Sequence, residues 1–95
     1  MTRLKRGKRV RVQCDAQPGP LGDELITINS QPIVLSGFVK KDLIERQGPN
    51  SYLRGIITRL TPEAVNVYLP GSFFTAASGI ASLTREWAEK NLESV

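Results

Sequence analysis

The chain has 95 residues, of which 40% are hydrophobic and 23% are charged, which suits one packed domain and excludes a disordered chain. Its net charge is +4, and it has no histidine and one cysteine, which excludes Ser-His and Cys-His catalysis, internal disulfides and zinc or iron–sulfur cages. The sequence shows neither a signal peptide nor the run of about 18 apolar residues that a membrane span needs, so we expect a cytoplasmic protein.

The first predicted strand is the segment "KRVRVQC", where apolar and polar side chains alternate with a period of two. This alternation places Val10, Val12 and Cys14 on the inner face of a half-buried strand. Arg9 and Arg11 then lie on its outer face. For the lone thiol of Cys14 the alternation favours a small core residue over a reactive one.

A loop rich in proline and glycine is expected over residues 15–24, followed by strands over 24–29 and 33–39. Gly37, inside the second of these strands, predicts a bulge or a sharp bend. The segment 40–51 is polar and leaves room for one helical turn.

Two more strands are predicted over residues 52–60 and 65–70, joined by a tight turn at "TPEA". The segment 64–84 carries no charge. Thr84 is predicted to cap a short C-terminal helix, with Trp87 packed against the core. Alternatively, the last residues, "NLESV", form a short final strand.

Short strands joined by Pro/Gly loops predict an all-β small barrel of about five strands with a short helical element near the C-terminus. The opening "LKRGKRVRV", the long loop after the first strand and the closing "WAEKNLESV" resemble the SH3-like small β-barrel superfamily. This superfamily includes KOW-type modules of ribosome and transcription proteins and small accessory subunits of photosynthetic and redox complexes. We therefore expect a single SH3-like barrel domain over residues 8–95, preceded by a basic N-terminal arm over residues 1–7.

The basic N-terminus is the first candidate site. Residues 1–11 carry six Lys or Arg and no acid, whereas residues 12–95 carry seven basic and nine acidic side chains. Lys and Arg gathered on one surface are typical of nucleic-acid binders, and an aromatic ring can stack on an unpaired base. The candidate nucleic-acid-binding residues are Arg3, Lys5, Arg6, Lys8, Arg9, Arg11, Lys40, Lys41 and Tyr52, with Tyr68 as an alternative stacking ring. The residues before the first strand are expected to form a mobile arm, and the competing interpretation is a solvated, solubilising N-terminus.

The uncharged segment is the second candidate site. Phe73 and Phe74 are adjacent, so a short element cannot bury both, and one is expected at the surface. Interface cores are depleted in charge, which favours a protein contact here. The candidate protein-interface residues are Phe73, Phe74 and Ile80, in a loop over 70–83. The competing interpretation is that this loop folds back and plugs one end of the barrel.

No catalytic residue, metal-ligand set or cofactor motif is predicted. We therefore expect a non-enzymatic binding module that contacts RNA or DNA through its basic N-terminal strand. The alternative is an accessory or adaptor subunit that docks on a larger protein complex, or on a second copy of itself, through the loop over 70–83.

Overall fold

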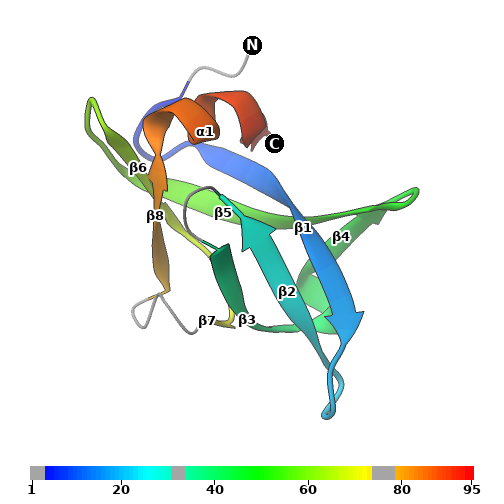
Figure 1. Cartoon of the computed structure of the whole chain (residues 1–95). Helices are drawn as coiled ribbons and strands as arrows, with labels where there is room; N and C mark the ends of the chain where they lie inside the picture. Colours follow the sequence, from blue (N-terminus) through cyan, green and yellow to red (C-terminus); the bar gives the residue numbers. More distant parts are fainter. Residues whose placement is uncertain (1–3, 31–33, 74–78) are drawn as a thin grey trace.

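The computed structural model describes residues 4–30, 34–73 and 79–95. In these residues antiparallel strands form a nearly closed small barrel, with one short α-helix at one end (Figure 1). The prediction of an all-β small barrel with a short C-terminal helical element is confirmed, and the architecture is compatible with an SH3-like barrel.

The described residues contain nine strands, one 3₁₀ turn and one α-helix. The strands are β1 (Arg9–Pro18), β2 (Asp23–Asn29), β3 (Val34–Lys40), β4 (Ile44–Gln47), β5 (Asn50–Leu60), β6 (Ala64–Tyr68), β7 (Ser72–Phe73), β8 (Ile80–Thr84) and β9 (Glu93–Ser94). The 3₁₀ turn is η1 (Lys41–Leu43), and the helix is α1 (Arg85–Asn91). No helix in the described part of the chain is long and apolar enough to cross a bilayer.

The long strand β1 belongs to both sides of the barrel. Residues 9–14 of β1 pair with β5, and residues 15–18 pair with β2. The full order is β7-β3-β2-β1-β5-β6-β8, with β4 added beside β5 and β9 beside β1. Among the described strands, β8 pairs only with β6, which leaves the barrel open along one seam.

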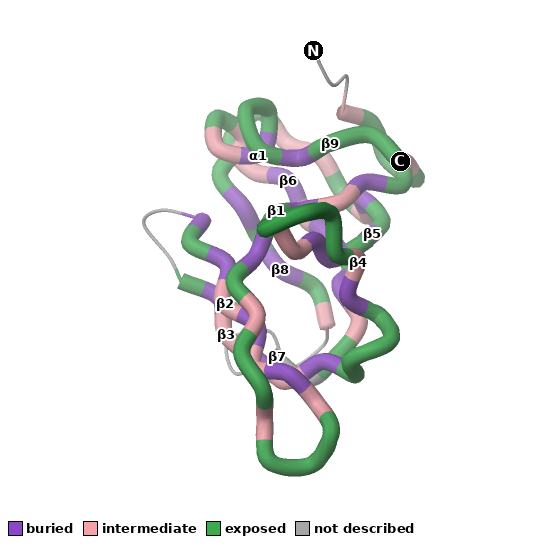
Figure 2. The backbone as a smooth tube through the Cα atoms, turned by 90° about the vertical axis from the view of Figure 1, so that its right-hand side faces the viewer, coloured by how far each residue is buried: buried purple, intermediate pink, exposed green. Residues whose placement is uncertain are grey.

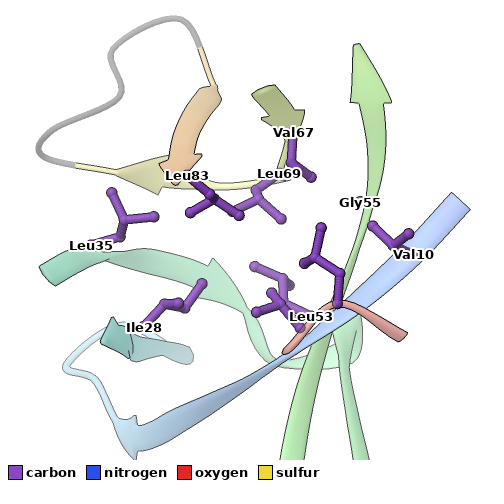
Figure 3. A pocket seen from close by; sticks show the side chains of 10 residues that line it. Val10, Ile28, Leu35, Leu53, Gly55, Val67, Leu69 and Leu83 are labelled. Atoms are coloured by element: carbon purple, nitrogen blue, oxygen red, sulfur yellow. The ribbon is translucent and has the colours of Figure 1, made fainter. Parts of the chain in front are cut away.

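The inner faces of the strands meet in a single core. Figure 2 shows buried and exposed residues alternating along the strands, as expected of one-sided burial. The fully buried side chains include Val10, Ile26, Ile28, Val39, Leu53, Ile57, Val65 and Val67. Figure 3 shows the barrel interior, where the remaining cavity of about 10 Å³ is no larger than one water molecule. The interior is therefore a packed core and not a ligand site.

The loop predicted over 15–24 is shorter in the structure. β1 continues to Pro18 and β2 begins at Asp23, so that only residues 19–22 turn. The N–H of Gly19 donates to the carbonyl of Asp23 at 2.8 Å and closes this hairpin. Proline is tolerated because it stands at the end of its strand, where its missing N–H breaks no inner ladder.

Of the bulge or sharp bend predicted at Gly37, the bulge is absent. The register between β2 and β3 runs without a shift along the whole of both strands. The irregularity lies instead between Ile57 and Arg59, where β5 shifts against β6. The strands β4, β7 and β8 lie in segments for which the sequence predicted no strand.

At the C-terminal end, the predicted cap is confirmed, since the hydroxyl of Thr84 accepts a hydrogen bond from the N–H of Trp87 at 3.3 Å. The two alternatives for the last residues both occur, because α1 ends at Asn91 and β9 follows it. Trp87 is half-buried and packs against the core, as predicted.

Candidate binding surface

The basic residues before β1 form a turn rather than a free arm. The N–H of Lys8 donates to the carbonyl of Lys5 at 3.1 Å. Between them Gly7 has a φ of +84°, the conformation that a type II turn needs at its third position. Lys5 and Arg6 are exposed on this turn.

Two backbone hydrogen bonds fasten this turn to the barrel. Gly7 donates to the carbonyl of Ile57 at 2.7 Å, and Ile57 donates to the carbonyl of Lys8 at 3.0 Å. Leu4 packs against the core. The structure therefore differs from the predicted mobile arm from residue 4 onward, while Arg3 lies outside the described residues.

Arg11 is held by neighbouring side chains. Its Nη2 donates to Glu93 at 3.0 Å and to Gln47 at 3.1 Å, and its Nη1 lies 3.5 Å from Glu45. Its guanidinium carbon lies 4.0 Å from the centre of the Tyr52 ring. These contacts tie β4 and β9 to β1, and the hydrogen bond to Glu93 raises the pKa of Arg11. Arg11 is thus a structural residue rather than the open phosphate contact that the sequence predicted.

Three other predicted residues do not join a common surface with the basic turn. Tyr52 is only 7% exposed and lies under Arg11, so its ring is closed to a stacked base. Lys40 and Lys41 are exposed, but the backbone of Lys40 stands opposite Asp23 in the β2–β3 ladder, beside the far end of β1. They are separated from Arg9 by the length of that strand.

A row of exposed side chains crosses the outer face of four adjacent strands. Arg9 on β1 pairs with Ile56 on β5, Ile56 with Tyr68 on β6, and Tyr68 with Ile80 on β8. We call these four residues the outer row. Ile56, Tyr68 and Ile80 are 40%, 48% and 39% exposed, which is high for large apolar side chains. Because neighbouring strands lie about 4.8 Å apart, the row is about 15 Å long.

A shallow hollow adjoins the basic end of the outer row. It is lined by Arg9, Arg54, Gly55, Ile56, Tyr68, Pro70 and Val95. Arg9 makes no ion pair with any described residue, whereas Arg54 forms two hydrogen bonds to Glu45, at 3.1 and 3.2 Å. These bonds lower the pKa of the Glu45 carboxyl. The hollow therefore has an apolar floor, one unpaired cation and one cation already neutralised.

The sequence reasoning missed Arg54, Ile56 and Val95. A signal for Ile56 was present, because Ile56 and Ile57 are adjacent in a strand and only one of them can face the core. No comparable signal marked Val95, whose position depends on the pairing of β9 with β1.

The predicted protein-interface residues fall into different places. Ile80 is exposed and forms the end of the outer row. The backbone of Phe73 pairs with Gly37 in β3, and Phe74 lies outside the described residues. Of the three, only Ile80 is placed on a described surface.

The described residues offer little reactive chemistry. Cys14 is buried, and burial raises the pKa of its thiol to about 11, which keeps it protonated at neutral pH. The described residues contain no group of three or more His, Cys, Asp or Glu side chains that could hold a metal ion. Glu24, predicted where the loop meets the second strand, is buried in β2, where Arg46 pairs with its carboxylate.

No protein-family model, curated protein or solved structure matches this chain. The basic turn and the outer row are two exposed features of the described residues that suit ligand binding. Together they combine positive charge, an exposed aromatic ring and apolar side chains, and Gly7 of the turn bonds to Ile57, the neighbour of Ile56 in the outer row.

Proposed function

We propose that this protein is a non-enzymatic module that binds single-stranded RNA or DNA on its outer row. The observation that carries the proposal is the register of Arg9, Ile56 and Tyr68 on three neighbouring strands. An exposed aromatic ring beside an unpaired cation suits a nucleotide, which has a flat apolar base and an anionic phosphate.

The apolar and the basic side chains of this surface bind different parts of the nucleotide. An unpaired base stacks on Tyr68 against the side chain of Ile56, which contributes about 1–3 kcal/mol per base. Phosphates lie at Arg9 and at the exposed Lys5 and Arg6 of the basic turn. Because every base has a π-face, this arrangement favours binding with little sequence preference.

The test is fluorescence anisotropy with labelled oligo(dT) and oligo(U) at about 50 and 200 mM salt. Three phosphate contacts on a single strand predict about a 20-fold loss of affinity between these concentrations. Arg9→Glu and Tyr68→Ala are each expected to weaken binding by about fivefold or more.

The matched controls are Lys41→Glu, which makes the same charge change at the far end of β1, and Leu21→Ala. Leu21 is 87% exposed in the β1–β2 turn. Both controls are expected to bind as the wild type does. The proposal is wrong if no binding occurs at low salt, or if Lys41→Glu weakens binding as much as Arg9→Glu.

A second candidate function is docking on a partner protein through the same row, as an accessory or adaptor subunit. Ile80 and Val95 extend the apolar surface beyond the area that one base covers, and Tyr and Arg are common anchors of protein interfaces. This function predicts binding that tolerates salt and is lost in Ile80→Ser, whereas nucleic-acid binding depends on salt and on Arg9.

A further inference from the structure

The open edge of β8 has a defined hydrogen-bonding pattern. At one end, the carbonyl of Gly79 accepts from the N–H of Leu69 at 2.8 Å. At the other end, the N–H of Arg85 donates to the carbonyl of Glu63 at 3.0 Å. Both bonds lie in the same ladder as the pairing of β8 with β6.

Residues of an antiparallel strand alternate in the direction of their backbone groups. Since positions 79 and 85 bond toward β6, positions 81 and 83 do so as well. Ile80 and Ser82 therefore turn their N–H and C=O groups away from β6, and Thr84 turns its N–H the same way. No other described strand pairs with this edge, which lies beside the open seam of the barrel (Figure 1).

β8 lacks the features that usually protect an edge strand. Its sequence, "IASLT", contains no charge and no proline, and its register with β6 has no shift. By contrast, the edge strand β4 carries Glu45 and Arg46, and β9 carries Glu93. Charges, prolines and bulges are the means by which edges avoid pairing with other chains. β8 is thus suited to accept another strand.

We propose that the strand that pairs with β8 is β8 of a second copy, in antiparallel register about Ser82. In this register Ser82 faces Ser82 of the second copy, and Ile80 faces its Thr84. The N–H and C=O groups of Ser82 then bond reciprocally across the twofold axis, and the carbonyl of each Ile80 accepts from the N–H of the facing Thr84.

The sequence of β8 favours its own copy as the partner. Self-pairing of "IASLT" brings no like charges together, and Ile and Thr are well suited to a cross-strand pair. It also covers Ile80, the exposed apolar end of the outer row. The inference is independent of nucleic-acid binding, because it uses the backbone edge and not Arg9 or Tyr68.

The test is sedimentation equilibrium over a range of protein concentrations, with variants at Ser82. The wild type is expected to dimerise reversibly, and Ser82→Thr, the matched control, is expected to do the same. Ser82→Lys and Ser82→Glu each place like charges directly opposite one another, so that the dimer dissociation constant rises by about tenfold or more. Because Ser82 is exposed on the outer face, both variants are expected to keep the circular dichroism of the wild type.

Mixing the two charged variants distinguishes this register from other contacts. An equimolar mixture of Ser82→Lys and Ser82→Glu is expected to restore a dimer, because opposite charges then face each other across the axis. A wild type that stays monomeric would overturn the proposal and leave the edge to an extended segment of another protein. Dimers of Ser82→Lys as tight as those of the wild type would also overturn it.

Discussion

Arg9 and Arg11 lie two residues apart on the same face of β1, yet their surroundings give them different roles. Arg9 is exposed without an ion pair to any described residue, whereas Arg11 contacts Glu93, Glu45 and the ring of Tyr52. Alternation along one strand shows which way a side chain points. It does not show what the neighbouring strands place beside that side chain.

Replacing Arg11 is expected to affect folding rather than ligand binding. Arg11→Ala removes the hydrogen bonds to Glu93 and Gln47, and uncovers the ring of Tyr52. We expect a lower melting temperature for Arg11→Ala, measured by circular dichroism, and an unchanged one for Arg9→Ala. Equal melting temperatures for the two variants would contradict a structural role for Arg11.

The thiol of Cys14 gives stability a dependence on alkaline pH. Burial raises the pKa of this thiol to about 11 in the folded protein, while an unfolded chain has the ordinary value of about 8.5. The stability that comes from keeping this thiol protonated in the folded state is therefore fully present below about pH 8.5. The free energy of unfolding then falls as the pH rises toward 11.

Urea unfolding at several pH values between 8 and 11 measures this effect. We expect the wild type to lose more stability across this range than Cys14→Ala, in which no thiol titrates. Parallel losses in the two proteins would show that the thiol titrates normally in the folded state.

Among the elements, β5 has a glycine, Gly55, where its backbone lies too close to that of β6 to leave room for a side chain. A Cβ built on Gly55 lies 2.5 Å from the carbonyl oxygen of Tyr68 and 2.8 Å from a methyl group of Val67. Gly55→Ala is expected to cost about 1–3 kcal/mol of unfolding free energy in urea titrations, because the backbone of β6 must move. A variant as stable as the wild type would mean that the two strands separate easily.

The cap of α1 makes a smaller contribution. Thr84→Ala removes the acceptor of the Trp87 N–H and is expected to cost about 1 kcal/mol. Thr84→Ser keeps that acceptor and serves as the control. A loss of equal size in both variants would show that the methyl group of Thr84, rather than its hydroxyl, stabilises this end of the barrel.

How well the sequence predicted an element depended on local pattern. The segments around Val10 and Val67 alternate clearly, and their strands and inward faces were predicted correctly. β4 was missed because three of its four residues are polar or charged, and its pairing comes from the hairpin with β5. β8 was missed because its small residues weaken the contrast between its two faces.

The outer row illustrates what a single sequence does not contain. Its four residues come from four strands, and Arg9 and Ile80 are far apart along the chain. Only the register between strands brings them into line, and register depends on the whole fold. The sequence could indicate that Ile56 or Ile57 faces outward, but not that Tyr68 and Arg9 stand beside it.

At the scale of the whole molecule, the Cα radius of gyration is 12.5 Å, the value of a compact domain of this length. Because Trp87 packs on the same core as the strands, tryptophan fluorescence and far-ultraviolet circular dichroism are expected to report one coincident unfolding transition. Two separate transitions would mean that α1 leaves the barrel independently.

Pairing of two copies would make this transition depend on protein concentration. The midpoint of the unfolding transition is expected to rise with protein concentration in the wild type and to stay constant in Ser82→Lys. The same change in both proteins would place the dimer contact away from β8.

The two-sided pairing of β1 also bears on the order of events during synthesis. β1 is synthesised early, but its pairing partners are synthesised later. Arg9 pairs with Ile56 of β5, and Val10 pairs with Ser94 of β9, which is synthesised 84 residues after it. At roughly 5–20 residues per second this takes roughly 4 to 17 s, during which one edge of β1 is unpaired. The Lys and Arg run at this end repels the same segment on neighbouring nascent chains. Its charge is therefore expected to oppose aggregation of the growing polypeptide.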